Sequence, residues 1–110
     1  MQQFTINVIE IIQTIPEGRV MTYGQIATSA GSPRGARQVA RILHSMSKKY
    51  HLPWHRVVNA QGMISIKDEE LHQVQKLSLE SEGVVVNKHG KINLQHYQHI
   101  RLSLSRLNGQ

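Results

Sequence analysis

Three arginines recur at helical spacing between residues 34 and 41. At about 100° per residue, Arg34, Arg37 and Arg41 fall within about 60° of one another on a helix. Four apolar residues lie on the opposite face: Ala36, Val39, Ala40 and Leu43. One face can therefore pack while the other presents guanidinium groups, which pair well with phosphates. The pattern indicates a polyanion-binding helix, although an amphipathic surface helix with solvated arginines has the same spacing.

A second candidate site lies in the segment Pro53–Val57. It places a large aromatic ring, an imidazole and a guanidinium group in succession, on Trp54, His55 and Arg56, beside a predicted strand. Such a cluster can bind a ligand through its ring and its polar groups. The alternative is a core tryptophan whose polar neighbours hydrogen-bond a turn, and composition alone leaves both open.

The chain contains no cysteine, which excludes disulfides, thiolate metal ligands and a thiol nucleophile. Seven histidines raise the question of a metal site. His96 and His99 are three residues apart, but no acidic residue joins them at a recognised spacing, and Pro53 separates His51 from His55. No nucleophilic serine turn, phosphate loop or dinucleotide motif is present. We expect neither a metal nor a cofactor.

The charge is unevenly distributed along the 110 residues, whose formal net charge is +6. Between residues 18 and 67 there is no acid, whereas eight lysines and arginines occur there. Such a block is typical of nucleic-acid binding, and a basic surface kept for solubility is the alternative. No apolar stretch approaches the length of a membrane span, so we expect a cytoplasmic protein without membrane contact.

The apolar spacing predicts three helices in the first half of the chain. The first spans residues 4–15. The second begins at a capping box of Thr22 and Gln25, which satisfies two backbone amides at a helix start. The third should span residues 33–46, because a first-turn proline loses no hydrogen bond. Helices joined by a tight turn at Gly31 form a helix-turn-helix, a motif typical of DNA-binding proteins.

The second half predicts shorter elements. In order they are a polar loop over 47–52, strands at 57–58 and 63–66, a helix from 68 to a C-cap at Gly83, and a hairpin over 84–94. Leu71, Val74 and Leu77 give that helix an apolar stripe. We expect a mostly α fold with a small β-hairpin or short strands, a winged helix-turn-helix-like single domain. It should cover residues 1–98, with residues 99–110 as a frayed tail.

Four ordered blocks of the sequence resemble a known family. They are Ile15–Ala27, Gly31–Val39, Pro53–Val57 and Glu82-Gly83. With compatible spacing over about residues 4–97, they resemble the DNA-binding domain of the O6-alkylguanine-DNA alkyltransferases. In that family the third block reads Pro-Cys-His-Arg-Val, and the cysteine accepts the alkyl group. Trp54 stands there in this chain, a replacement similar to that in the alkyltransferase-like proteins.

The resemblance implies recognition without reaction. Alkyl transfer needs a deprotonable nucleophile aligned behind the alkyl carbon. The Trp54 indole is neutral and only a hydrogen-bond donor, so it cannot replace the sulfur. His55 and Glu82, the remnant of the activating network, would then be structural. The expected protein is a catalytically inactive homologue of the methylated-DNA–protein-cysteine methyltransferases.

The resemblance also assigns the DNA contacts. Arg37 is the arginine finger that enters the minor groove and fills the gap left by a flipped nucleotide, and Tyr23 helps to rotate that nucleotide out. The backbone contacts are assigned to Arg34, Gly35, Ala36 and Arg41. The small residues Gly35 and Ala36 allow the close approach of the backbone that a narrow groove requires. The pocket for the flipped base is assigned to Tyr23, Trp54, Val57 and Ile64.

The expected partner is double-stranded DNA containing O6-alkylguanine, bound by a monomer that associates with the nucleoid. By resemblance, nucleotide excision repair proteins would act on the flagged lesion. The family's Tyr-x-x-Gly segment is absent around residues 66–69, which alters the pocket rim. Two alternatives stay open at this point. One is a transcription regulator that reads the major groove through Gln38 and the arginines, and the other is a residual base-modifying enzyme.

Overall fold

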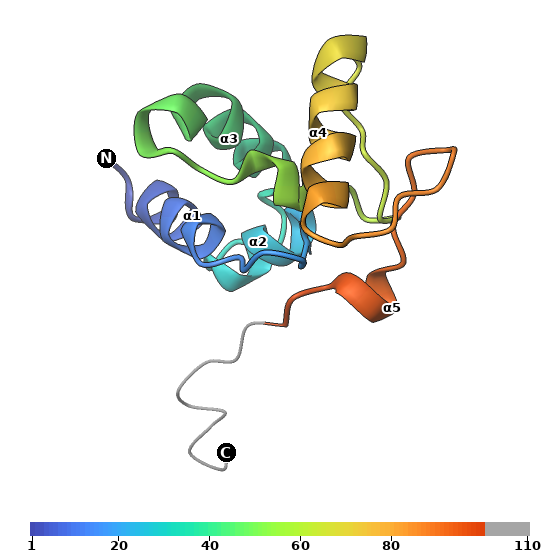
Figure 1. Cartoon of the computed structure of the whole chain (residues 1–110). Helices are drawn as coiled ribbons and strands as arrows, with labels where there is room; N and C mark the ends of the chain where they lie inside the picture. The colour runs from blue at the N-terminus through green and yellow to red at the C-terminus, as the bar shows by residue number, and fades with distance from the viewer. Residues whose placement is uncertain (101–110) are drawn as a thin grey trace.

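The computed structural model describes residues 1–100 of the chain, which fold around two apolar clusters (Figure 1). The elements in order are α1 (Gln3–Gln13), β1 (Met21–Thr22), α2 (Tyr23–Ser29), α3 (Ala36–Tyr50), the 3₁₀ turn η1 (Trp54–Arg56), β2 (Val57–Val58), α4 (Glu69–Ser81) and α5 (Leu94–Tyr97). The mostly helical fold class predicted from the sequence is confirmed.

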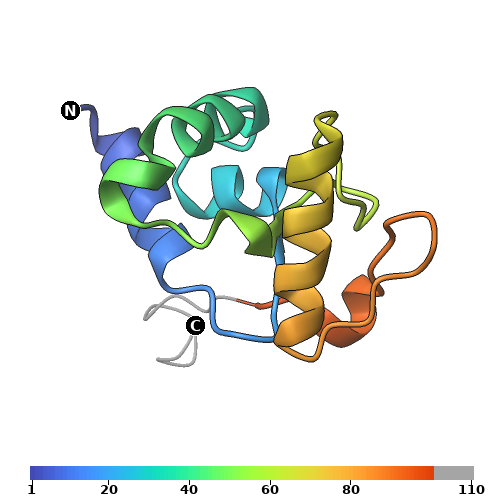
Figure 2. The ribbon, with the colours of Figure 1, turned by 45° about the horizontal axis from the view of Figure 1, so that its top comes forward.

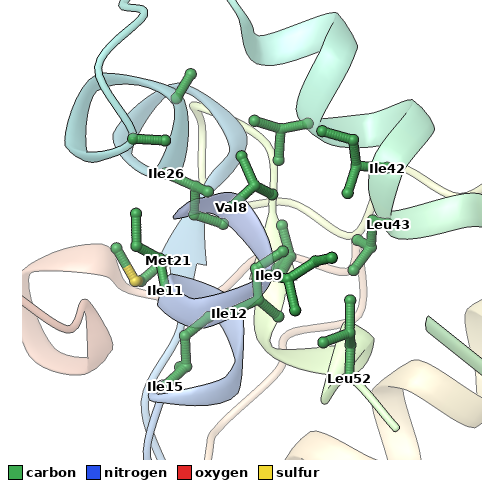
Figure 3. Close-up of a cluster of buried hydrophobic side chains, with 14 residues drawn as sticks. Val8, Ile9, Ile11, Ile12, Ile15, Met21, Ile26, Ile42, Leu43 and Leu52 are labelled. Carbon is green, nitrogen blue, oxygen red and sulfur yellow. The ribbon is translucent and has the colours of Figure 1, made fainter. Parts of the chain in front are cut away.

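The first cluster lies among α1, α2 and α3 (Figure 3). Val8 and Ile12 on α1, Ile26 on α2 and Val39 on α3 are fully buried there. These are the residues whose helical spacing marked the apolar faces, and burying each side chain contributes roughly 1.5–3 kcal/mol. The three helices therefore form one packed unit that fixes the direction of α3.

The second cluster lies under α4, which stands beside the three-helix unit in both ribbon views (Figures 1 and 2). Its members are Val20, Val58, Ile64, Leu79, Val84, Val86 and Ile92. A two-stranded parallel sheet lies between the clusters, pairing Met21 with Val57 and Thr22 with Val58. Both residues of each strand are buried, so the sheet joins the helix-turn-helix to the second half of the chain.

Helix α3 differs at both ends from the predicted span of 33–46. It begins at Ala36, because the Gly35 amide donates to the Ser32 carbonyl at 2.9 Å and closes a turn before the helix. It continues through the predicted loop to Tyr50 and ends at His51, which is left-handed with φ 52°. Two lysines in the last turn favour this extension through the helix dipole.

The predicted strand at 63–66 and hairpin at 84–94 were wrong in detail. The described part of the chain has only one bridge there, between Met63 and Lys91. The Asn87 side chain accepts from the amides of His89 and Lys91, at 2.8 and 2.9 Å, and so closes the loop without a strand ladder. Val84 and Val86 reach the core from an unpaired segment.

Helix α4 begins at the Asp68 N-cap and ends in a turn at Gly83, whose φ of +87° suits glycine. The predicted apolar stripe does not face the core, since Leu71, Val74 and Leu77 are 44–55% exposed. Gln75 and Leu79 are buried instead. The helix is therefore turned so that a polar residue contacts the interior.

Backbone hydrogen bonding continues just past residue 98, where the end of the domain was expected. The His99 amide donates to the Val20 carbonyl at 2.8 Å, and Val20 donates to the Tyr97 carbonyl at 2.9 Å. The backbone around residue 98 thus lies parallel to the chain just before β1. The remainder of the predicted frayed tail, residues 101–110, lies outside the described residues.

Candidate functional site

The first helix of the helix-turn-helix, α2, begins at the capping box that the sequence predicted. The Gln25 amide donates to the Thr22 hydroxyl at 3.0 Å, and the Thr22 amide donates to the Gln25 side chain at 3.3 Å. This capping box fixes the start of α2 and so places Tyr23 as its first residue. The cap also connects to the C-terminal segment, because the Gln98 amide group donates to the Gln25 side chain at 2.9 Å.

The turn before α3 depends on glycine at position 35. Gly35 is buried, and a Cβ added to it would lie 2.9 Å from Cζ of Phe4 and 3.1 Å from the Ser32 carbonyl oxygen. The absence of a side chain is therefore required by packing against α1. This internal contact explains the glycine without reference to a ligand.

The three arginines are exposed on α3 and in the turn before it. Arg37 and Arg41 lie on α3, and Arg34 lies in the turn before it, not on the helix as expected. All three are exposed, and none forms an ion pair within the described residues. Their guanidinium groups remain available to a polyanion, although only Arg37 and Arg41 share the helix face that the sequence pattern predicted.

A cavity of about 430 Å³ opens beside α3. Its lining comes from α2, α3, η1, the 65–66 segment and α4: Tyr23, Ala40, Leu43, His44, Ser47, Trp54, Ser65, Ile66, Leu71 and Gln75. Ala40 was expected on the packed face but is exposed here. The cavity has the size of a small-molecule site and combines aromatic and aliphatic walls with a few polar groups.

Two of the four residues assigned to the pocket line this cavity, and two do not. Tyr23 and Trp54 contribute to its walls. Val57 and Ile64 are only 1% and 6% exposed and belong to the two apolar clusters. The Val57 side chain packs in the first cluster and the Ile64 side chain in the second, whereas Ser65 and Ile66, the two residues after Ile64, line the cavity.

The Tyr23 phenol is set into this wall rather than free in solvent. Burial raises the pKa of Tyr23, and a hydrogen bond with the Ser65 side chain opposes part of that increase. The phenol is therefore neutral at physiological pH and can donate as well as accept a hydrogen bond. Ser65 was not singled out from the sequence.

The residues after Trp54 join a charged network with the end of α4. His55 Nε2 lies 2.8 Å from Oε2 of Glu82, and Arg56 Nη2 donates to the same oxygen at 2.7 Å. Arg56 also donates through Nη1 to the Ile15 carbonyl at 2.7 Å. The Gly18 amide donates to Oε1 of Glu82 at 3.1 Å. One carboxylate thus ties together three segments distant in sequence.

This network keeps Glu82 ionised. Burial by itself raises the pKa of the carboxyl, but hydrogen bonds from Arg56, His55 and the Gly18 amide outweigh it and lower the pKa to about 2. Its side chain is 12% exposed, and those of His55 and Arg56 are 18% and 14% exposed. The pairing of His55 with Glu82 that the resemblance implied is present, and Arg56 is a third member that the sequence analysis missed.

Several cavity residues also escaped the sequence analysis. His44 and Ser47 follow Ala40 at i+4 and i+7, so they share its helix face. Ser47 was missed because the third helix was expected to end at Met46, whereas His44 lay within the expected helix and was not singled out. Leu71 was assigned to an apolar stripe, and no sequence pattern indicated that Gln75 is buried.

The described residues contain no group of three or more potential metal ligands among histidine, cysteine and acidic side chains. None of the helices in this part of the chain has the length and apolar character needed to cross a membrane. The polar side chains that line the cavity include those of Tyr23, His44, Ser47, Ser65 and Gln75.

Comparison with known proteins places these features in a family. The model for the 6-O-methylguanine DNA methyltransferase DNA-binding domain matches residues 3–84. The chain belongs to this family. The matched span of the alkyltransferase domain contains the exposed arginines, the cavity and the network around Glu82. The resemblance identified from the sequence is thereby confirmed.

Relatives of this alkyltransferase-family chain are similar over nearly its whole length. The DNA base-flipping protein of Vibrio parahaemolyticus is 45% identical over 98 residues, which are 89% of this chain and 97% of that protein. Alkyltransferase-like protein 1 of Schizosaccharomyces pombe is 40% identical over 102 residues, covering 88% of this chain and 94% of the relative.

The fold of this alkyltransferase-family chain also matches solved structures. The crystal structure of S. pombe Atl1 in complex with damaged DNA containing O6-carboxymethylguanine matches with a TM-score of 0.82 at 39% identity. The match covers 92% of this chain and 98% of that one.

Proposed function

We propose that this chain binds double-stranded DNA containing O6-alkylguanine, flips the damaged nucleotide and holds it without removing the alkyl group. The observation that carries the proposal is the position of Trp54. It lines the cavity, and the residue after it is paired with Glu82 at 2.8 Å. By resemblance this is where the family holds its reactive cysteine, so the pocket and the supporting network are present around a residue that accepts no alkyl group.

The cavity suits a flipped base with a substituent. Trp54 and Tyr23 supply aromatic walls, and base stacking on an aromatic ring contributes roughly 1–3 kcal/mol. This gain offsets the few kcal/mol that flipping a damaged nucleotide costs. Ile66 and Leu71 provide apolar surface at the wall for an alkyl group, and the Ser65 hydroxyl, which is hydrogen-bonded to the Tyr23 phenol, adds a polar group.

Arg37 is proposed as the finger that enters the minor groove in place of the flipped nucleotide. Arg37 is the second residue of α3 and is exposed, so its guanidinium group extends from the start of the helix. Arg34 and Arg41, with the backbone at Gly35 and Ala36, would contact phosphates on either side. The S. pombe relative was crystallised with DNA containing an O6-alkylated guanine, which supports this class of ligand.

The downstream role follows from the absence of chemistry. A protein that holds the lesion and does not repair it must act through others, and we propose that the bound complex flags the lesion for nucleotide excision repair. Binding of this kind would associate an otherwise cytoplasmic monomer with the nucleoid. Pull-down of excision-repair proteins by the chain, with and without alkylated DNA, tests the point. Capture that requires the alkylated duplex is expected, and no capture in either case would contradict it.

The assigned role of Arg37 is tested with two variants. Arg37→Ala should weaken binding to a duplex with one O6-methylguanine by about 10- to 100-fold, the equivalent of the 1.5–3 kcal/mol typical of a charged hydrogen bond. Lys88→Ala is the matched control, because Lys88 is an exposed cation in the loop after α4. Fluorescence anisotropy with labelled duplexes measures both. Equal losses in the two variants would contradict a specific role for Arg37.

A further inference from the structure

Gln75 occupies an unusual position for a polar side chain. Only two polar residues of the described part of the chain are classed as buried, Thr22 and Gln75. Thr22 caps α2, which accounts for its burial. Gln75 lies in the middle of α4, where the helix satisfies its own backbone, and is 3% exposed. Burying an amide at this point costs free energy unless its hydrogen bonds are made.

The Gln75 amide group makes those bonds to the segment that carries Trp54. Its Nε2 donates to the His55 carbonyl at 3.1 Å and to the Val57 carbonyl at 3.0 Å. Both amide hydrogens are therefore engaged by the backbone on either side of Arg56. Trp54 directly precedes the first of these carbonyls, and it lines the same cavity as Gln75.

Gln75 and Glu82 hold this segment from the same side. They are seven positions apart, and Glu82 directly follows the last residue of α4. If the helical geometry continues to Glu82, the two side chains lie within about 20° of each other around the helix axis. Glu82 binds the side chains of His55 and Arg56, whereas Gln75 binds the backbone. An apolar residue at position 75 would leave two carbonyls without these donors. The two residues thus fix the segment in complementary ways.

We propose that Gln75 is a positioning residue, which sets the place of the Trp54 wall and thereby the preference for an alkylated base over an ordinary one. This inference rests on the proposed function. The arginines proposed to contact DNA are not among the residues that line the cavity; they lie on α3 and in the turn before it. Loss of Gln75 should therefore reduce selectivity while general DNA binding persists.

The test compares Gln75→Met with Gln73→Met. The substitution removes the amide at similar length, and Gln73 is exposed on the same helix. Trp54 is the only tryptophan of the chain, so acrylamide quenching of its fluorescence reports on this wall alone. We expect Gln75→Met to be quenched at least twofold more efficiently than the wild type, and Gln73→Met to be unchanged.

Binding supplies the second readout. The ratio of Kd values for an unmodified duplex and for one with O6-methylguanine should fall at least tenfold in Gln75→Met, while the Kd for unmodified DNA changes by less than twofold. Circular dichroism establishes that both variants are folded. A folded Gln75→Met with wild-type quenching and wild-type selectivity would overturn the inference, as would equal losses for both kinds of DNA.

Two further measurements keep the test decisive if Gln75→Met does not fold. In the wild-type protein, the side-chain amide protons of Gln75 should exchange with water at least tenfold more slowly than those of Gln73, and equal rates would overturn the inference. Gln75→Asn keeps the amide but shortens the side chain by one methylene, so that it no longer reaches both carbonyls, and it should show the same loss of selectivity. If the wild type itself shows no preference for alkylated DNA, the proposed function fails, whereas the quenching comparison still tests the positioning role.

Discussion

Replacing Glu82 with glutamine tests whether the network beside Trp54 is a structural brace. The carboxylate accepts from His55 and Arg56 and from the Gly18 amide, and it joins the end of α4 to two distant segments. Glutamine has the same shape but only one acceptor oxygen and no charge. The change therefore leaves the Arg56 guanidinium, which is 14% exposed, without its anionic partner.

The expected loss can be worked from these contacts. Removing one partner of a buried ion pair costs about 3–5 kcal/mol, and hydrogen bonds to charged groups contribute about 1.5–3 kcal/mol each. The side chains here keep 12–18% of their exposure, and glutamine retains one acceptor. We therefore expect Glu82→Gln to lower the free energy of unfolding by about 2–3 kcal/mol. For a domain of this size, that corresponds to a fall in Tm of about 10 °C.

Urea unfolding at pH 7, followed by far-ultraviolet circular dichroism, measures the loss. Glu80→Gln is the matched control, because Glu80 lies on the same helix, is exposed and forms no ion pair within the described residues. Its free energy of unfolding should stay within about 0.5 kcal/mol of the wild type. If both variants unfold with the same free energy, the network does not brace the fold and the reasoning is refuted.

Three further predictions concern stability. Folding lowers the pKa of Glu82 from 4.5 to about 2, so the stabilisation by this carboxylate is complete above pH 4.5 and is lost toward pH 2. The difference in free energy of unfolding between wild type and Glu82→Gln should therefore shrink by about 1–2 kcal/mol over that range, once solvent screening is allowed for. A difference that stays constant with pH would contradict this. Gly35→Ala should lower the free energy of unfolding in urea by about 1–3 kcal/mol, because the added Cβ would lie 2.9 Å from Phe4. Gly24→Ala, where the added Cβ has open space on α2, should be neutral or stabilising. If Gly24→Ala were the more destabilising of the two, the packing argument would be refuted. Thr22→Ala removes the cap of α2 and should lower the thermal unfolding free energy by about 1 kcal/mol, and an unchanged Tm would show that the cap contributes nothing.

The helix-turn-helix could be predicted because its signals are local. Apolar residues at helical spacing mark α1, and the capping box at Thr22 fixes the start of α2. The end of α3 was missed because polar residues such as Ser47 and Lys48 carry no apolar periodicity, although they suit a helix C-terminus. The start was misplaced because Pro33 fits the first turn of a helix as well as it fits a turn before one.

The second half was harder to predict because its structure depends on long-range contacts. Val84 and Val86 alternate as strand residues do, yet they pack beneath α4 without a partner strand. The orientation predicted for α4 was wrong, because the spacing of Leu71 and Val74 indicated a core face that is exposed in the structure. Gln75 faces inward instead, where its amide satisfies two carbonyls of a segment about 20 residues earlier.

The site was therefore predicted only in part. Arg37 and Tyr23 were identified by resemblance, and their positions on α3 and at the cavity are compatible with the assigned roles. Val57 and Ile64 were also assigned to the pocket by resemblance, but their side chains are buried in the first and second apolar clusters. Burial of a side chain depends on the packing of both apolar clusters, which no local pattern specifies.

The central claim is recognition of O6-alkylguanine without alkyl transfer. The most direct measurement incubates excess protein with a duplex containing one O6-methylguanine, determines Kd by anisotropy against the matched unmodified duplex, and then analyses DNA and protein by mass. We expect tighter binding to the modified duplex, with the methyl group still on guanine and the protein mass unchanged. Loss of the methyl group, release of the base, a methylated protein, or equal affinity for both duplexes would contradict it.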